Sequence, residues 1–215
     1  MVANRASQAA SAGSSRDRAT KGNLMSLLKG ILVSLPVITV LAFTSDASAV
    51  GVQGACENEI RSAAAKYGVP EGILYSVGLT ETGRKGRLDP NAMNIEGKSV
   101  FSASRNEAMA AFEEAKRNGA KLIDLGCMQI NQYFHGENFS SPQEMFDPKR
   151  NVEYAAMFLK NLHDRHETWT MAVARYHAGP NNDPAQKKYV CRVISNLVAT
   201  GYGKWTTNAK NFCDQ

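Results

Sequence analysis

Residues 70–83 read PEGILYSVGLTETG, and this stretch predicts the helix around which the fold is built. Pro70 suits the first turn of a helix, and Gly83 suits the position just after the last turn. Leu74 and Glu81 are seven residues apart, so both side chains lie on the same face of that helix. The sequence therefore predicts a carboxylate among apolar neighbours, which is an unusual place for a glutamate.

Glu81 has two interpretations at this point. Removal from water raises the pKa of a carboxyl group, and a group that protonates a glycosidic oxygen near neutral pH needs such a raised pKa. Alternatively, Glu81 turns into solvent at the helix end or pairs with Arg84 or Lys85. The spacing alone leaves both interpretations open.

The rest of the chain predicts a mainly helical α+β domain. Ala-rich periodicity, capping signals and glycine stops indicate further helices. The expected helices cover residues 56–67, a segment from the capping box at 104–107 to Gly119, a segment from Asp147 onward, 169–176 and 189–198. The segment from Asp147 has an apolar stripe of Val152, Ala155, Ala156, Phe158, Leu159 and Leu162, and a loop of residues 179–184, which includes Pro184, separates the last two helices. Residues 92–101 predict two short strands around a Glu96-Gly97 turn, and 122–125 predict a short strand or an extended entry to a glycine loop. No internal repeat is evident.

The N-terminal residues 1–49 predict a signal peptide with a polar extension. Residues 30–43 form an uncharged, mostly apolar run that is shorter than the roughly 20 residues needed to cross a bilayer. Ala47-Ser48-Ala49 resembles a signal-peptidase site, so we expect cleavage before Val50. The alternatives are an uncleaved anchor or a buried helix. A start at Met25 would give a signal peptide of ordinary length. Residues 50–215 are expected to form the functional domain.

The charge of the chain gives little support for a nucleic-acid partner. The whole chain has a formal charge of +5, but residues 1–49 contain five Lys or Arg and only two Asp. The remaining residues have a net charge of +2 and mix both signs along the sequence. A groove that follows phosphates needs clustered basic residues, so we expect no nucleic acid as a partner.

All four cysteines follow the expected cleavage site. An even number of cysteines in an exported chain predicts two disulfides, with three possible pairings. There is no C-x-x-C pair, and the four histidines show no ligand spacing, so we expect neither a metal nor a cofactor. The cysteines are Cys56, Cys127, Cys191 and Cys213, and the histidines are His135, His163, His166 and His177.

Three separated segments contain polar groups that a purely structural interpretation does not explain. They are Glu81-Thr82-Gly83, Gly126-Cys127-Met128-Gln129-Ile130-Asn131, and Ala174-Arg175-Tyr176-His177-Ala178-Gly179, with Tyr189-Val190 soon after. In their order they resemble the motifs of the soluble lytic transglycosylase family, lysozyme-like enzymes of the bacterial cell wall. The resemblance covers roughly residues 56–200. It implies a lysozyme-like helical domain, in which the hairpin and the helix that follows it form an insertion near the cleft.

The resemblance implies a one-carboxylate mechanism. Glu81 would protonate the oxygen between N-acetylmuramic acid and N-acetylglucosamine, assisted by the N-acetyl oxygen of the sugar. It would then take a proton from the 6-hydroxyl, and that hydroxyl would close a 1,6-anhydro ring without consuming water. The alternatives are a hydrolytic, lysozyme-like muramidase and a non-catalytic peptidoglycan-binding component of an envelope-spanning machine.

The same resemblance implies a set of substrate-binding residues. Met128 and Gln129 match a loop that lines the cleft and holds the acetamido group, although core packing is an equal interpretation of Met128. Tyr189 matches a tyrosine that orients the catalytic carboxyl group, and a packed surface aromatic is its alternative. Two positions depart from the family pattern, Thr82 for serine and His177 for asparagine. The full expected set is Thr82, Met128, Gln129, Asn131, Tyr176, His177 and Tyr189.

The disulfide pairing also follows from the arrangement that the resemblance implies. If the segments around Cys127 and Cys191 converge on Glu81, these two cysteines should pair, which leaves Cys56 for Cys213. Asp124, just before the glycine loop, is expected to be a loop-stabilising acceptor rather than a second catalytic acid.

The expected partners are peptidoglycan strands, and relatives also serve secretion, conjugation or flagellar assemblies. We expect a periplasmic or secreted protein.

Overall fold

The computed structural model describes residues 54–84, 86–179 and 182–214. The predicted signal peptide and its cleavage site lie outside these residues. The helices are α1 (Ala55–Tyr67), α2 (Glu71–Thr82), α3 (Arg105–Arg117), α4 (Gln132–His135), the 3-10 turn η1 (Gly136–Asn138), α5 (Pro142–Met145), α6 (Pro148–His166), α7 (Trp169–Ala178), α8 (Asp183–Ala199) and α9 (Thr207–Cys213). The strands are β1 (Ala92–Ile95), β2 (Lys98–Phe101), β3 (Ile123–Leu125) and β4 (Ile130–Asn131).

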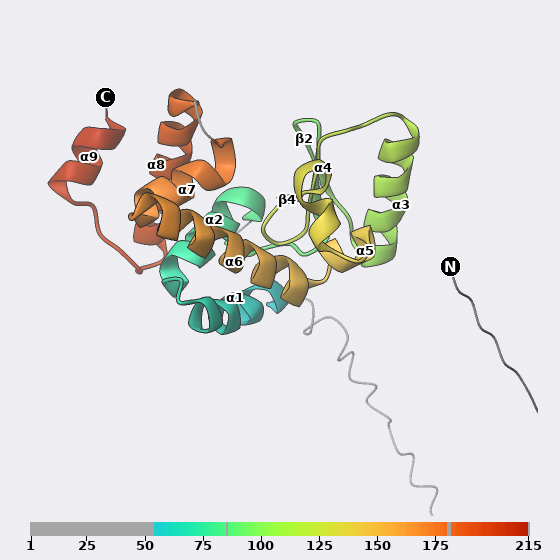
Figure 1. The fold of residues 1–215 in the computed structure, drawn as a ribbon, viewed down its shortest axis with the longest axis horizontal. Helices are drawn as coiled ribbons and strands as arrows, with labels where there is room; N and C mark the ends of the chain where they lie inside the picture. The colour runs from blue at the N-terminus through green and yellow to red at the C-terminus, as the bar shows by residue number, and fades with distance from the viewer. Residues whose placement is uncertain (1–53, 85, 180–181, 215) are drawn as a thin grey trace, which may run out of the picture. The chain divides into compact units, whose positions relative to one another are not determined.

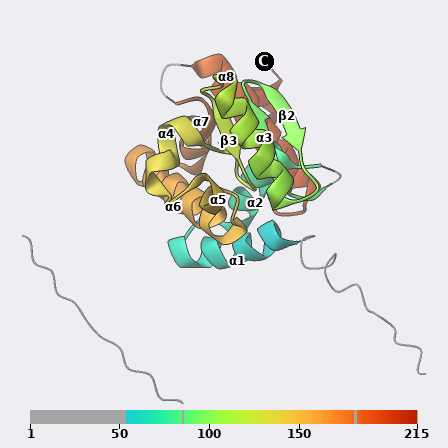
Figure 2. The same cartoon turned by 90° about the vertical axis from the view of Figure 1, so that its right-hand side faces the viewer.

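The predicted fold class, mainly helical with a small β element, is confirmed. Figure 1 shows α1, α2, α6, α7 and α8 gathered in one part of the domain and the strands with α3 in another. The predicted hairpin is present, but it belongs to a four-stranded antiparallel sheet with the order β2-β1-β3-β4. In Figure 2, α3 lies beside this sheet, where it packs on β1.

Helix α6 forms the centre of the helical part because its apolar stripe is fully covered. It packs against α1 on one side and α7 on the other. The stripe residues Val152, Ala155, Ala156, Leu159 and Leu162 are all buried. Their spacing of three and four residues places them on one face, as the sequence predicted. Within the described parts of the chain, no helix is both long enough and apolar enough to span a membrane.

The predicted capping box begins α3. Ser104 accepts a hydrogen bond from the Glu107 amide at 3.2 Å, and Glu107 accepts one from the Ala103 amide at 3.0 Å. The reciprocal bond therefore goes to the residue before the cap rather than to the cap itself. Both bonds satisfy backbone donors that a helix start would otherwise leave unpaired.

The predicted start of the last long helix at Tyr189 is wrong. Helix α8 begins at Asp183, and the Asn182 side chain accepts a bond from the Ala185 amide. Pro184 was interpreted as part of a loop, but proline fits the first turn of a helix because its missing N–H has no partner there. Tyr189 therefore lies within the helix rather than at its start.

The expected disulfide pairing is also wrong. Cys56 bonds Cys127, and Cys191 bonds Cys213. The reason is helical geometry: Cys191 follows Tyr189 by two residues, which turns it by about 200° around α8. Tyr189 faces the interior, so Cys191 faces outward and meets α9. The partner left for Cys127 is Cys56 on α1.

Candidate active site

Glu81 lies in the last turn of α2 with only 15 % of its side chain exposed. Its helix is buried along the face that holds Leu74, Val77 and Gly78. Gly78 has no room for a side chain, because an added Cβ would lie 2.5 Å from Leu88 Cδ2 and 3.1 Å from Met128 Sδ. The backbone of α2 can therefore approach the glycine loop closely, just ahead of Glu81.

Two aromatic rings from different helices meet at the Glu81 carboxyl group. The Tyr189 hydroxyl on α8 donates a hydrogen bond to Glu81 Oε1 at 2.5 Å. His177, at the end of α7, has Nδ1 3.9 Å from the same oxygen. Its ring stacks on the Tyr189 ring with centroids 4.2 Å apart and planes 3° apart. Tyr189 is almost fully buried, so the pair forms a fixed wall beside the carboxyl group.

The surroundings of Glu81 raise its pKa to about 7. Burial is the main cause, because it disfavours the charged carboxylate, and the negative charge of Asp124 acts in the same direction. The Tyr189 hydrogen bond and the positive charge of Arg192 oppose the shift. Glu81 therefore exchanges its proton near neutral pH, as a group that both donates and accepts a proton requires.

Burial and the charge of Arg192 lower the pKa of His177. The imidazole is therefore mostly neutral at pH 7, and it adds no positive charge that would favour the Glu81 carboxylate. Burial also raises the pKa of Tyr189 well above its usual value, and the nearby Glu81 charge adds to this. The Tyr189 phenol consequently stays protonated, so its hydroxyl can donate a hydrogen bond to Glu81.

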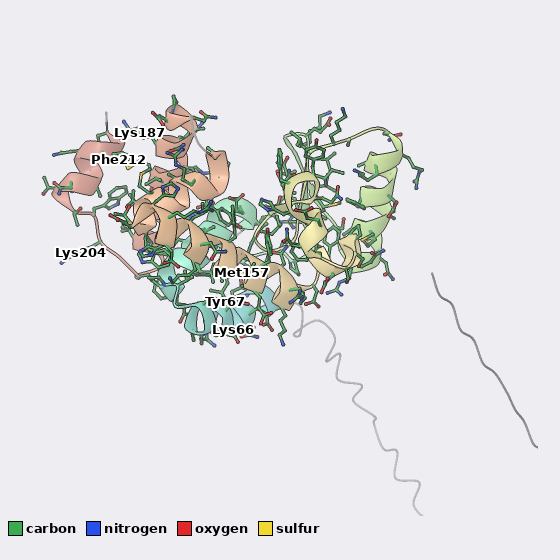
Figure 3. The ribbon with its side chains drawn as sticks, viewed as in Figure 1. Lys66, Tyr67, Met157, Lys187, Lys204 and Phe212 are labelled. Carbon is green, nitrogen blue, oxygen red and sulfur yellow. A yellow bond between two sulfur atoms is a disulfide. The ribbon has the colours of Figure 1, made fainter. Side chains whose placement is uncertain are left out.

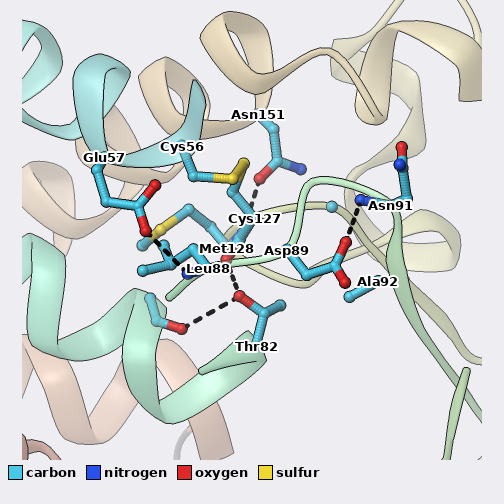
Figure 4. The surroundings of a disulfide bond; sticks show 12 residues. Cys56, Glu57, Thr82, Leu88, Asp89, Asn91, Ala92, Cys127, Met128 and Asn151 are labelled. Carbon is cyan, nitrogen blue, oxygen red and sulfur yellow. Dashed lines mark hydrogen bonds between the residues drawn. A yellow bond between two sulfur atoms is a disulfide. The ribbon is translucent and has the colours of Figure 1, made fainter. Parts of the chain in front are cut away.

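Asn151 of α6 holds the loop of residues 126–131 in place (Figure 4). Asn151 is fully buried, and its Oδ1 accepts the Met128 amide at 2.8 Å while its Nδ2 donates to the Leu125 carbonyl at 2.8 Å. Gly126 has φ of +77°, and an added Cβ would lie 2.7 Å from Asn151 Nδ2. Only glycine therefore fits this turn. The sequence interpretation missed Asn151, although it is a polar residue next to the apolar stripe of α6.

Thr82 and Met128 fix the loop to the helices rather than face open space. The Thr82 hydroxyl donates to the Cys127 carbonyl at 2.9 Å, and the threonine is 3 % exposed. Met128 is completely buried, and its carbonyl accepts the Tyr176 hydroxyl at 2.9 Å. These contacts join α2, α7 and the loop. In this structure Thr82, Met128 and Tyr176 support the walls of the site. Neither Thr82 nor Met128 offers a free surface to a ligand.

Gln129 adopts a left-handed backbone conformation with φ of +48°, which is uncommon for any residue other than glycine. Its Nε2 donates to the carbonyls of Ala92 and Gly126, at 3.1 and 3.0 Å. These bonds tie the strained loop to β1. Within the described residues, Gln129 Oε1 accepts no hydrogen bond, so it remains the one end of this amide that a ligand N–H can use.

Asn131 and Asp124 pair with each other across β3 and β4. Asn131 Nδ2 donates to Asp124 Oδ1 at 2.7 Å, and Asn131 Oδ1 caps α4 by accepting the Tyr133 amide at 3.0 Å. Burial raises the pKa of Asp124, and the bond from Asn131 opposes this. Asp124 thus serves as an acceptor that stabilises the loop, and its charge acts on Glu81 from a distance.

Arg192 is a second residue that the sequence interpretation missed. Its Nη2 donates to the Thr80 carbonyl at 3.1 Å, one residue before Glu81. The spacing in the sequence could have indicated this residue, because Arg192 follows Tyr189 by three residues and so lies on a neighbouring part of the same helix. Among the residues that the structure describes, no group of three or more His, Cys, Asp or Glu side chains is arranged to hold a metal ion.

A scan against family models matches residues 58–196 to the transglycosylase SLT domain. This match covers more than half of the 215 residues, so the chain belongs to that family. Members of the family are lytic transglycosylases, enzymes that cleave the glycan strands of peptidoglycan. Searches of curated proteins and of solved structures gave no match.

Proposed function

We propose that this protein is a peptidoglycan lytic transglycosylase that cleaves the β-1,4 bond between N-acetylmuramic acid and N-acetylglucosamine, with Glu81 as the proton donor and then the proton acceptor. The observation that carries this proposal is the buried carboxyl group of Glu81, whose pKa is about 7 and whose Oε1 accepts the Tyr189 hydroxyl. A group with this pKa is present in both protonation states at neutral pH, which suits the two roles.

In the first step, protonated Glu81 gives its proton to the oxygen of the glycosidic bond. The bond from C1 of the muramic acid residue to that oxygen breaks, and the N-acetyl oxygen of the same sugar supports the electron-poor C1. The N-acetylglucosamine side leaves as an alcohol. Tyr189 stabilises the Glu81 carboxylate that forms, because its hydroxyl already points at Oε1.

In the second step, the Glu81 carboxylate removes the proton of the muramic acid 6-hydroxyl. That oxygen attacks C1 and closes the 1,6-anhydro ring. Glu81 is protonated again, so the cycle is complete without water as a reactant. Asp124 takes no part in this scheme because its carboxylate accepts the Asn131 amide.

The remaining residues of the site are proposed to hold the substrate or the walls around it. Gln129 Oε1 is suited to accept the N–H of the acetamido group, because the two Nε2 hydrogens already bond the protein. His177 is half exposed beside Tyr189 and is suited to contact a sugar. Thr82, Met128, Tyr176 and Asn131 act on the substrate through the loop that they position.

The proposed place of action is outside the cytoplasmic membrane, where peptidoglycan lies. The two disulfides support this, because such bonds persist in oxidising compartments. Export by residues 1–49 with cleavage after Ala49 remains a prediction that N-terminal sequencing of the exported protein would test. Service to an envelope-spanning secretion or flagellar assembly also stays a prediction.

Product analysis tests the proposed reaction. Purified peptidoglycan is digested in water enriched in heavy oxygen, and the fragments are analysed by mass spectrometry. We expect muropeptides that end in 1,6-anhydro-muramic acid and contain no heavy oxygen, because ring closure consumes no water. Reducing ends that contain heavy oxygen would instead identify a hydrolytic muramidase. No fragments at all would identify a protein that binds peptidoglycan without cleaving it.

A further inference from the structure

A pocket of about 840 Å³ lies between α8 and the C-terminal segment. Its lining includes Leu79, Lys187, Lys188, Arg192, Trp205 and Asp214. Trp205 and Asp214 lie beyond residue 196, where the family match ends. Part of this pocket is therefore supplied by a segment outside the part of the chain that matches the family.

The C-terminal wall of the pocket is fixed in place by covalent and aromatic contacts. The Cys191–Cys213 disulfide ties α9 to α8. Lys187 Nζ on α8 lies 5.6 Å from the centre of the Phe212 ring on α9. Figure 3 labels both side chains. Because α9 has only seven residues, it needs such contacts to keep its position.

The lining of the pocket suits a ligand with carboxylate groups. Lys188 and Arg192 bring positive charges to the lining, and Asp214 brings a negative charge. Trp205, 37 % exposed, adds an aromatic surface to the same lining. Basic side chains form charge-assisted hydrogen bonds with carboxylates, and an aromatic wall packs the apolar groups between them. A short peptide with free carboxylates has this combination.

Arg192 connects the pocket with the surroundings of the proposed catalytic group. Leu79 precedes Glu81 by two residues on α2, and Arg192 donates to the Thr80 carbonyl at 3.1 Å. The charge of Arg192 also lowers the pKa of Glu81, so this side chain both lines the pocket and acts on the proposed catalytic group. A peptide of four or five extended residues reaches on the order of 15 Å.

We infer that this pocket binds the carboxylates of the peptide stem that extends from the muramic acid sugar at Glu81. This inference rests on the proposed function, because it is the glycan strand at Glu81 that brings a stem to the pocket. Lys188 and Arg192 bind the carboxylates, and Trp205 packs on the apolar part of the stem. The C-terminal segment thereby makes the enzyme prefer strands that carry stems.

The test measures binding of two ligands to the full exported chain with the substitution Glu81→Gln, which removes the proposed proton donor. One ligand is a short glycan chain with its peptide stems, and the other is the same chain after an amidase has removed them. We expect the stems to lower the Kd about tenfold in this parent protein. Lys188→Glu should abolish that gain by placing a negative charge in the pocket, and Trp205→Ala should reduce it. Lys149→Glu, the same change at an exposed position of α6, should retain the gain.

The inference would be overturned if both ligands bound the parent equally well, or if Lys188→Glu weakened both ligands by the same factor. A failure of the proposed function gives a different result, because the Glu81→Gln protein would then cleave the ligands, or the unmodified protein would form no anhydro products. Absence of binding by either ligand would overturn both the inference and the proposed function.

Discussion

The two disulfides fix two regions that differ in burial and in charge. Cys56–Cys127 joins the first turn of α1, two residues before the family match begins at residue 58, to the loop just before Met128. Cys191–Cys213 joins α8 to α9, and of these two helices only α9 lies wholly beyond the end of that match. The first region surrounds a buried carboxyl group with backbone contacts. The second forms a charged pocket on the outside of α8. The domain thus separates the residues proposed for bond cleavage from the wall proposed for substrate selection.

The largest expected effect belongs to the first region. Glu81→Gln keeps the size of the side chain but removes the transferable proton. We expect a loss of turnover of about 10²–10⁴-fold, the usual contribution of a general acid. Peptidoglycan digestion followed by chromatography of the soluble fragments measures this loss. Glu113→Gln on α3 is the matched control and should retain full activity. Turnover near the wild-type level in Glu81→Gln would contradict the assignment of Glu81.

Removal of each disulfide should distinguish the two regions. Cys56 and Cys127 are 71 residues apart, whereas Cys191 and Cys213 are 22 apart. In the chain-entropy description, the loss of these links costs about 4 and about 3 kcal/mol of unfolding free energy, respectively. Paired Cys→Ser variants should be compared by urea unfolding and by activity under conditions in which both remain folded.

The activities of these two variants should differ more than their stabilities. Loss of Cys56–Cys127 frees the loop that positions Met128 and Gln129, so cleavage should fall on every substrate. Loss of Cys191–Cys213 frees only the pocket wall, so the effect should be confined to substrates that carry stems. Equal losses in both variants would show that the two regions do not act separately.

The smallest effect is the pH dependence of stability, and it belongs to the first region alone. The pKa of Glu81 is raised from 4.5 to about 7, so the folded state holds a proton that the unfolded state releases. The stabilisation from this proton is complete below pH 4.5 and is lost as the pH rises through 7. Relative to Glu81→Gln, the wild type should lose about 3 kcal/mol between pH 4 and pH 9.

Urea unfolding at several pH values measures this difference. The Cys191→Ser/Cys213→Ser variant should show the same pH dependence as the wild type, because Glu81 keeps its burial and its Tyr189 bond. Activity should also decrease above pH 7 as Glu81 loses the proton that the first step requires. A pH dependence that is identical in wild type and Glu81→Gln would contradict the raised pKa.

Several local features of the fold could be predicted from the sequence. The helix that carries Glu81, the capping box of α3 and the hairpin at residues 92–101 all depend on contacts between residues that are close in the chain. Periodicity, caps and turn residues report such contacts directly. Pro184 misled the interpretation because proline both ends helices and begins them, and only the Asn182 cap distinguishes the two cases.

Contacts between distant segments were harder to predict. The order of the motifs pointed to Glu81 and Tyr189, which the fold brings into contact. The same order gave the wrong cysteine partners, because it does not report the direction in which each side chain leaves its helix. For Met128 it left core packing and a place in the cleft equally open, and it gave no indication that Thr82 is buried. Nor did it indicate that Asn151 and Arg192 hold the loop and the end of α2.

A helical domain and one carboxyl group on an apolar helix face could be predicted from residue types and their local spacing, and the order of the motifs resembled that of a known family. What surrounds that carboxyl group depends on the tertiary structure. The pKa of Glu81, the disulfide pairs and the pocket beside Trp205 all depend on how far each helix is rotated about its axis. That rotation is set by packing over the whole core, which no short stretch of residues contains.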